Sequence, residues 1–230
     1  MGNSSSGTLV IAVDGPSGSG KSSASRGVAR ELGLRYLDTG ATYRAITWLV
    51  LSRDVDPADR PAVAALVRAS TVEISTDPDD QWVILDGRDI SRGIRTREVD
   101  SNVSAVAAVA EVRERMTAMQ REIIAKATPG IVAEGRDVGR VVAPDAVLKV
   151  YLTADPEARA RRRAPDRGLA VDVTVTDQAR RDRLDAAQSA KADDAVLIDA
   201  TDLTLEQVIG EITALARERS ALAYTGDLKR

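Results

Sequence analysis

A glycine-rich segment near the N-terminus carries the clearest chemistry of this chain. Residues 15–22 read G-P-S-G-S-G-K-S and match the pattern G-x-x-x-x-G-K-[S/T], whose backbone amides surround the phosphates of a nucleotide. Glycines let these amides approach phosphate oxygens without a Cβ clash, and a following helix places its positive end at the same point. The segment predicts an ATP site formed by Gly15, Pro16, Ser17, Gly18, Ser19, Gly20, Lys21, Ser22 and Ser23.

Two side chains of this segment have chemical roles. Lys21 is expected to reach the β- and γ-phosphates, and the Ser22 hydroxyl is expected to be a ligand of Mg²⁺. ATP and Mg²⁺ are therefore the predicted cofactors. The alternative is a glycine- and serine-rich turn that only caps a helix. The apolar run Leu9–Val13 before the motif and the helical spacing over Lys21–Leu32 after it favour the phosphate loop.

A phosphate loop alone does not separate switches, motors and kinases. Guanine-nucleotide switches need an N-K-x-D base reader, but the asparagines are Asn3 and Asn102, and neither is followed by lysine. The length of 230 residues argues against a motor or a large ATPase. A kinase of a small molecule is the class that remains.

Composition excludes other chemistry and other partners. The chain has no cysteine and no histidine, which removes thiolate nucleophiles, histidine triads and histidine-bound zinc. Its net charge of −3 and few aromatic residues argue against a nucleic-acid partner. No apolar run approaches the roughly 20 residues that span a bilayer, so no membrane partner is predicted. Residues 1–8 are expected to form a flexible leader without the features of a signal peptide.

Short apolar strands alternate with helical segments along most of the chain. This order predicts an α/β fold, a doubly wound parallel sheet with helices on both faces, over residues 9–230. Around 66–98 the pattern changes to an antiparallel meander, which we interpret as an insert. The expected strands are Leu9–Val13, Arg35–Leu37, Val72–Ser75, Trp82–Leu85, Ile131–Ala133, Val147–Leu152 and Val196–Asp199, and the helices are Lys21–Leu32, Ala41–Leu51, Arg97–Lys126, Pro156–Arg163, Asp177–Asp185 and Thr204–Ala221.

Further segments carry a resemblance to a known family. They are YLDTGATYRA, IRTREVDSNVSAVAAVAEVR, GIVAEGRDVGRVVAPDA and ADDAVLIDATDLTLEQVI, together with the phosphate loop. On these segments the chain resembles the bacterial cytidylate kinases, P-loop kinases of nucleoside monophosphates, from Leu9 to about Leu215. The resemblance implies transfer of phosphate from ATP to CMP or dCMP, a monophosphate-binding insert, a lid at about 156–185, and a monomeric cytoplasmic enzyme.

The resemblance also implies roles for individual residues. Lys21, Arg44, Arg136 and Arg181 are the implied catalytic residues, and Arg44 and Arg136 would grip the acceptor phosphate with two guanidinium forks. Arg159 and Arg163 are expected to contact ATP from the lid. The implied substrate-binding residues are Thr39, Arg113 and Asp137 at the cytosine ring, Ser104, Arg181 and Asp185 at the ribose, and Tyr43 beside the phosphate.

Simpler interpretations of several of these residues remain open at this point. Asp137 could cap a turn, Arg113 could pair with Glu111 or Glu114, and Tyr43 could pack in the core. Asp14 and Asp38 follow the first two strands, where either could support Mg²⁺, the loop or a turn.

One segment departs from the family pattern. After Asp185 the chain reads A-A-Q-S-A-K-A, with Gln188 where the family has an arginine and without its Ser-Pro-Leu run. The lid between Arg163 and Ala179 is also short. A kinase of UMP, of another nucleotide or of a shikimate-like hydroxyl compound is one alternative. A nucleotide-binding regulatory module without phosphate transfer is the other.

Overall fold

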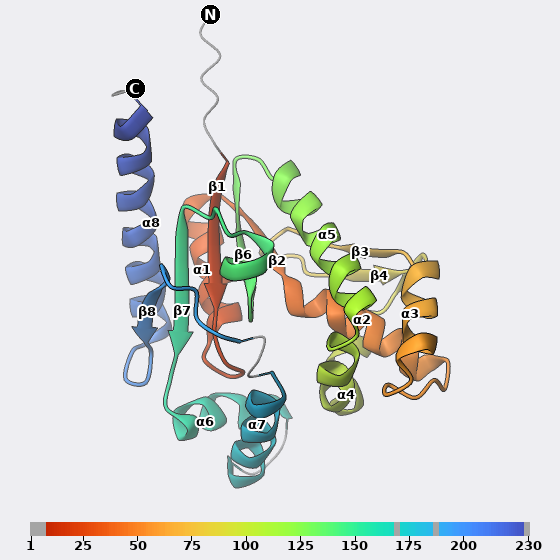
Figure 1. Cartoon of the computed structure of the whole chain (residues 1–230). Coiled ribbons are helices and arrows are strands. Elements are labelled where there is room, and N and C mark those ends of the chain that lie inside the picture. Colours follow the sequence, from red (N-terminus) through yellow and green to blue (C-terminus); the bar gives the residue numbers. More distant parts are fainter. Residues whose placement is uncertain (1–7, 168–170, 186–188, 228–230) are drawn as a thin grey trace, which may run out of the picture.

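A parallel five-stranded sheet forms the centre of the molecule (Figure 1). The computed structural model describes residues 8–167, 171–185 and 189–227, so the expected leader lies almost wholly outside the described residues. The strand order is β2-β6-β1-β7-β8, with all neighbours parallel. The strands are β1 (Leu9–Asp14), β2 (Arg35–Asp38), β6 (Gly130–Gly135), β7 (Leu148–Thr153) and β8 (Val196–Asp199).

Helices cover both faces of this sheet. On one face, α1 (Lys21–Leu32) and α8 (Leu205–Asp227) pack side by side over β1 and β7, where Val28, Ile11 and Ile212 share one buried cluster. On the other face, α5 (Ala110–Lys126) and the short π-helix η2 (Val138–Val142) cover β6 and β2. Strands buried on both faces are continuously apolar, which is why short apolar runs predicted the parallel sheet. The predicted doubly wound α/β fold is confirmed.

A second, smaller sheet lies beside the main one. It contains β3 (Val72–Ile74), β4 (Val83–Leu85) and β5 (Arg88–Asp89) in antiparallel order, as the meander pattern predicts. This sheet packs on α2 (Thr39–Ser52) through a cluster that contains Leu49, Val83 and Ile94. The 3-10 helix η1 (Gly93–Arg95) follows it, and α3 (Arg60–Ala69), which the sequence analysis does not place, precedes it.

The single long helix predicted over Arg97–Lys126 is two helices. The first helix, α4 (Arg97–Ala107), has Ala108 as its C-cap. The N-cap of α5 is Val109, whose backbone is extended with φ −74° and ψ 126°. The break brings Val106, Val109 and Val112 into one buried cluster with α2 and α3. Helical propensity continues through this turn, so only the tertiary packing locates the break.

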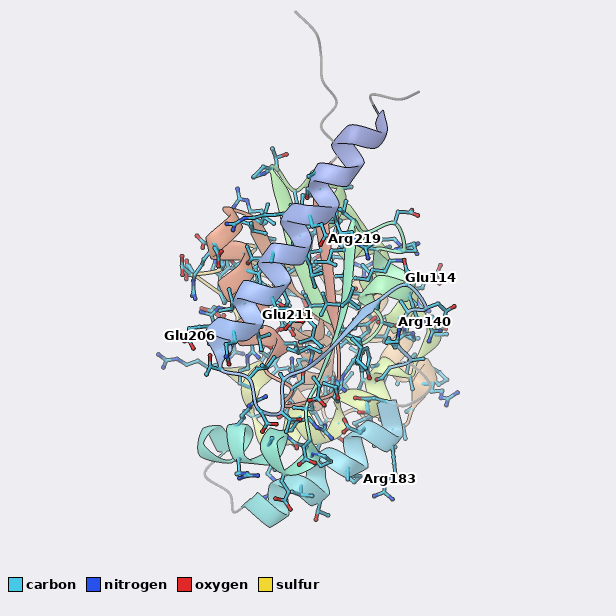
Figure 2. All side chains as sticks on the ribbon, turned by 90° about the vertical axis from the view of Figure 1, so that its left-hand side faces the viewer. Glu114, Arg140, Arg183, Glu206, Glu211 and Arg219 are labelled. Carbon is cyan, nitrogen blue, oxygen red and sulfur yellow. The ribbon has the colours of Figure 1, made fainter. Side chains whose placement is uncertain are left out.

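Two helices lie below the carboxyl ends of the strands (Figure 1). These are α6 (Pro156–Arg167) and α7 (Val171–Asp185), which pack on each other and fall within the segment that the sequence predicts as a lid. Figure 2 shows Arg183 projecting from α7 away from the sheet, so part of the Arg180–Arg183 cluster is a solvated face.

Over the residues that the structure describes, no helix combines the length and the apolarity needed to span a membrane.

Candidate functional site

One large cleft opens at the carboxyl ends of the parallel strands, where α/β folds bind ligands. Its volume is about 460 Å³. Segments that lie far apart in the sequence line it: the phosphate loop, the start of α2, α4, α5, the end of β6, α6 and the start of α8. The predicted site residues on its walls are Gly18, Ser17, Ser19, Gly20, Lys21, Ser22, Ser23, Thr39, Tyr43, Arg44, Ser104, Arg113, Arg136, Asp137 and Asp185.

The phosphate loop has the backbone that its glycines predict. Gly15 has φ 152°, and a Cβ there would lie 2.1 Å from the carbonyl oxygen of Leu152 in β7. Gly20 is the N-cap of α1 in the left-handed region, with φ 94°. No side chain caps α1 in the described structure, and its first turn has no acidic residue. The positive end of α1 therefore faces the cleft without a side-chain cap, as in helix N-termini that bind anions.

Lys21 begins α1 and faces buried carboxylates. Its ammonium group donates to the Pro16 carbonyl at 3.2 Å. Its positive charge acts on Asp14, Asp38 and Glu134, so it lies near all three carboxylates. A lysine in this position supplies the cation that the phosphate-loop motif requires at the β- and γ-phosphates.

Glu134, at the end of β6, is a buried carboxylate beside the loop. The Tyr36 hydroxyl donates to it at 2.7 Å, and the Ser22 hydroxyl also hydrogen-bonds to it. Burial and, after it, the nearby charge of Asp38 raise the pKa of Glu134. Burial also favours the neutral form of Asp38, but Arg44 and Arg95 outweigh it and lower the pKa of that carboxyl.

These oxygen atoms fit a nucleotide-bound magnesium ion. The Ser22 hydroxyl and the Glu134 carboxylate lie side by side, and oxygen is the ligand type that Mg²⁺ prefers. The described residues contain no cluster of three or more acidic side chains that could hold a metal alone. This agrees with the usual pattern for Mg²⁺, which is bound by one or two protein oxygens together with substrate phosphates.

Arg44 and Arg136 both reach the cleft and are held by carboxylates. The Arg44 Nε lies 3.4 Å from Asp100, and its Nη1 lies 3.9 Å from Asp38. The Arg136 guanidinium lies 3.0 Å from Asp185 and 3.6 Å from Asp182, which are both on α7. The two planar cations therefore face one cavity from α2 and from the end of β6, as a clamp on a phosphate dianion requires.

Arg113 and Asp137 form an ion pair in the wall of the same cleft. Arg113 lies on α5, and Asp137 lies between β6 and η2, so the fold brings together residues that are 24 positions apart. Arg113 therefore has an ion-pair partner on a different segment of the chain, not only the possible helical neighbours Glu111 and Glu114. The pair can offer a carboxylate acceptor and guanidinium donors to one ligand.

Three other predicted residues lie around this pair. The Thr39 hydroxyl donates to the Glu134 carbonyl at 2.7 Å, so the threonine is fixed at the wall of the cleft. Ser104 on α4 donates to Asp185 on α7 at 2.8 Å. Tyr43 lines the cleft while its ring packs against the cluster around Val112.

The lid arginines take different positions. The buried Arg159 guanidinium donates to the Ser17 carbonyl at 3.1 Å and pairs with Asp182 at 2.6 Å, and it does not line the cleft. Arg162, which the sequence analysis does not select, does line it. Its guanidinium donates to the Ser19 carbonyl at 3.3 Å and to the Ala200 carbonyl at 2.5 Å. The side chains of Arg163 and Arg181 and the whole of Gln188 lie outside the described part of the structure.

Arg95 is a second residue that the sequence analysis missed. It reaches the cleft from η1, and its guanidinium lies 3.2 Å from Asp38, the carboxylate that also faces Arg44. Arg95 lies within I-R-T-R-E-V-D, one of the segments that carry the family resemblance. That segment was the available signal for this residue.

Comparisons with known proteins agree with this geometry. The sequence profile of the family described as Cytidylate kinase matches residues 11–218. The cytidylate kinase of Streptomyces avermitilis is 50% identical over 218 residues, which cover 93% of this chain and 94% of that protein. The cytidylate kinase of Mycolicibacterium paratuberculosis is 46% identical over 224 residues, covering 94% of this chain and 98% of that protein.

Among solved structures, a gluconokinase from Sinorhizobium meliloti superposes with a TM-score of 0.54 at 14% identity, covering 95% of this chain and 97% of that one. At this identity the likeness concerns the fold alone. The sequence match extends over nearly the whole chain and includes every segment that lines the cleft. The chain therefore belongs to the cytidylate kinase family.

Proposed function

We propose that this protein transfers the γ-phosphoryl group of ATP to CMP and dCMP, which yields ADP and CDP or dCDP. The observation that carries the proposal is a single cleft lined both by the phosphate loop and by the Arg113–Asp137 pair. Arg44 and Arg136 also line this cleft. An acceptor bound by its base and its phosphate would then present a phosphate oxygen to the γ-phosphorus.

Cytosine matches the pair of groups at the acceptor end. Its N4 amine is a donor, and its N3 and O2 are acceptors, so Asp137 would accept from the amine while Arg113 donates to the ring. Uracil carries O4 and an N3–H in the corresponding places and would meet both groups with the wrong polarity. Thr39 would add one contact to the base. On the family resemblance, Ser104, Arg181 and Asp185 would be partners of the ribose hydroxyls.

Phosphoryl transfer in this site is a matter of position and charge. Arg44 and Arg136 would hold the acceptor phosphate in line, and Lys21 with the loop amides would hold the donor. The acceptor phosphate is already a nucleophile near neutral pH, so no general base is needed. When bound, Mg²⁺ neutralises charge on the β- and γ-phosphates, and the Ser22 hydroxyl would hold it. We further propose, on the family resemblance, that the enzyme acts as a cytoplasmic monomer.

Arg162 gives a direct test of the ATP end. Arg162→Ala is expected to raise the KM for ATP by about tenfold, because one charged donor at the wall of the cleft is lost. Arg161→Ala is the matched control, since Arg161 is exposed and pairs along its own helix with Glu157 at 3.5 Å. Steady-state kinetics with varied ATP at saturating CMP measures both variants. Equal KM values for ATP in the two variants would show that Arg162 does not contribute to ATP binding.

The function itself is tested with a panel of acceptors. The protein is incubated with ATP, Mg²⁺ and one acceptor, which is CMP, dCMP, UMP, AMP, GMP or dTMP. ADP release is followed with a coupled enzyme assay. Fast turnover of CMP and dCMP alone is the expected result. Turnover of a different acceptor would support a kinase but contradict the proposed recognition of cytosine by Arg113 and Asp137. ATP binding without turnover of any acceptor would favour the regulatory module.

A further inference from the structure

The mechanism above leaves one buried carboxylate without a role. Asp14 is the last residue of β1, directly before the phosphate loop, and only 5% of its surface is exposed. Its two oxygens accept one backbone N–H each: Oδ1 from Val138 and Oδ2 from Gly139, both at 2.8 Å. Asp14, which precedes the phosphate loop, thus binds the first turn of η2, next to Arg136 and Asp137.

These two hydrogen bonds fix a short segment that carries acceptor-site side chains. On one side, β1 and β6 pair in parallel, and Asp14 lies opposite Gly135. On the other side, Asp14 holds the amides of Val138 and Gly139. Arg136 and Asp137 are the two residues between these fixed points, so the orientation of both depends on where Asp14 holds the chain.

The local packing leaves little freedom to this contact. A Cβ on Gly139 would lie 3.4 Å from Asp14 Oδ2 and 3.2 Å from the Lys149 side chain, so the glycine allows the carboxylate to approach the amides closely. Val138 and Asp14 are both buried. The hydrogen bonds of Asp14 to Val138 and Gly139 therefore lie in the interior between β1, β7 and η2, away from solvent.

Stability alone does not explain a carboxylate at this position. Burial raises the pKa of Asp14 to about 6, although the Gly139 and Val138 amides act in the opposite direction. At neutral pH the folded protein thus keeps a charge that its interior disfavours. The other charged or titratable groups that face Asp14 are Asp137, Lys21 and Tyr151, and the Lys149 side chain lies beside Gly139.

We propose that Asp14 is a positioning residue of the acceptor site, which sets the orientation of Asp137 opposite Arg113 and thereby the selectivity for the base. The inference rests on the proposed function. It assigns part of the selectivity for the acceptor to a residue of the ATP-binding strand, 124 positions away from the nearer of the two amides that it holds.

Asp14→Asn tests the inference with little change in volume. The amide oxygen can accept one N–H, but the amide nitrogen then faces the second donor, so the turn loses one of its two anchors. The ratio of kcat/KM for CMP to that for UMP is expected to fall by about tenfold, while the KM for ATP stays within about twofold. Asp145→Asn, at an exposed position just after η2, is the control with the same chemical change.

The outcomes separate three explanations. A lower CMP-to-UMP ratio with an unchanged Tm supports the inference, because a purely structural residue would not change base selectivity. An unchanged ratio in a folded Asp14→Asn variant overturns it. If the wild-type protein does not turn over CMP, the proposed function fails and the inference about base selectivity fails with it, whereas an unchanged ratio in an active protein overturns the inference alone.

If the variant does not fold, the wild-type protein decides the question through its pH dependence. Protonation of Asp14 below about pH 6 removes one acceptor, so the CMP-to-UMP ratio is expected to fall between pH 8 and pH 5.5. The phosphates of the two acceptors titrate alike, and the ratio therefore cancels their common effect. A ratio that stays flat across this range overturns the inference.

Discussion

Lys21→Met is expected to lower kcat by about 10³-fold, the size of effect that follows the loss of a cation placed at developing negative charge. Lys21 stands at the positive end of α1, where its charge acts on Asp14, Asp38 and Glu134. Without it, a bound triphosphate would face these buried carboxylates with no side-chain ammonium between them. The charge is needed most when the γ-phosphoryl group is in transit, so the loss falls mainly on kcat.

Single-turnover and steady-state kinetics with saturating ATP and CMP measure this effect. Lys126→Met is the control, because Lys126 is exposed at the end of α5 and pairs there with Glu122. Circular dichroism and Tm establish that both variants fold. A decrease in kcat smaller than about tenfold for Lys21→Met would contradict the assignment of this lysine to phosphoryl transfer.

Asp137→Ala is expected to lower kcat/KM for CMP by about 10²- to 10⁴-fold, while the affinity for ATP changes little. The substitution leaves the N4 amine of cytosine without its acceptor and leaves Arg113, a quarter of whose side chain is exposed, without its ion-pair partner. Both losses concern Asp137 and Arg113, which line the cleft where the acceptor is proposed to bind.

A double-mutant cycle with Arg113→Ala measures how much of this loss belongs to the pair. If Arg113 and Asp137 read the base together, the double variant should lose little more than the more severe single variant. The kinetics are measured with CMP and with UMP, and ATP binding is followed separately. Equal losses for CMP turnover and for ATP affinity would show that Asp137 supports the fold rather than the base.

The parallel sheet, the small antiparallel sheet and the position of the phosphate loop are predictable from the sequence. Apolar runs broken by helical periodicity predict the parallel sheet, and turn signals around Asp77 and Asp86 predict the small antiparallel sheet. The phosphate loop is predictable because its glycines, Lys21 and the start of α1 are consecutive in the chain. In each case, the pattern reflects conformational preferences that act locally, within one strand, turn or helix.

The tertiary structure alone decided how distant side chains meet. The division of the segment Arg97–Lys126 into α4 and α5 depends on packing of Val109 against α2 and α3, which local propensity does not contain. Whether Arg159 or Arg162 lines the cleft depends on how α6 lies against the loop and α7.

The two aspartates that end β1 and β2 illustrate the same limit. From the sequence, either could hold a metal, a loop or a turn. In the folded chain, Asp38 faces Arg44 and Arg95, and Asp14 binds the amides of η2. Hydrogen bonds between residues 124 positions apart leave no periodicity in the chain, because they exist only once the strand order has placed β1 beside β6.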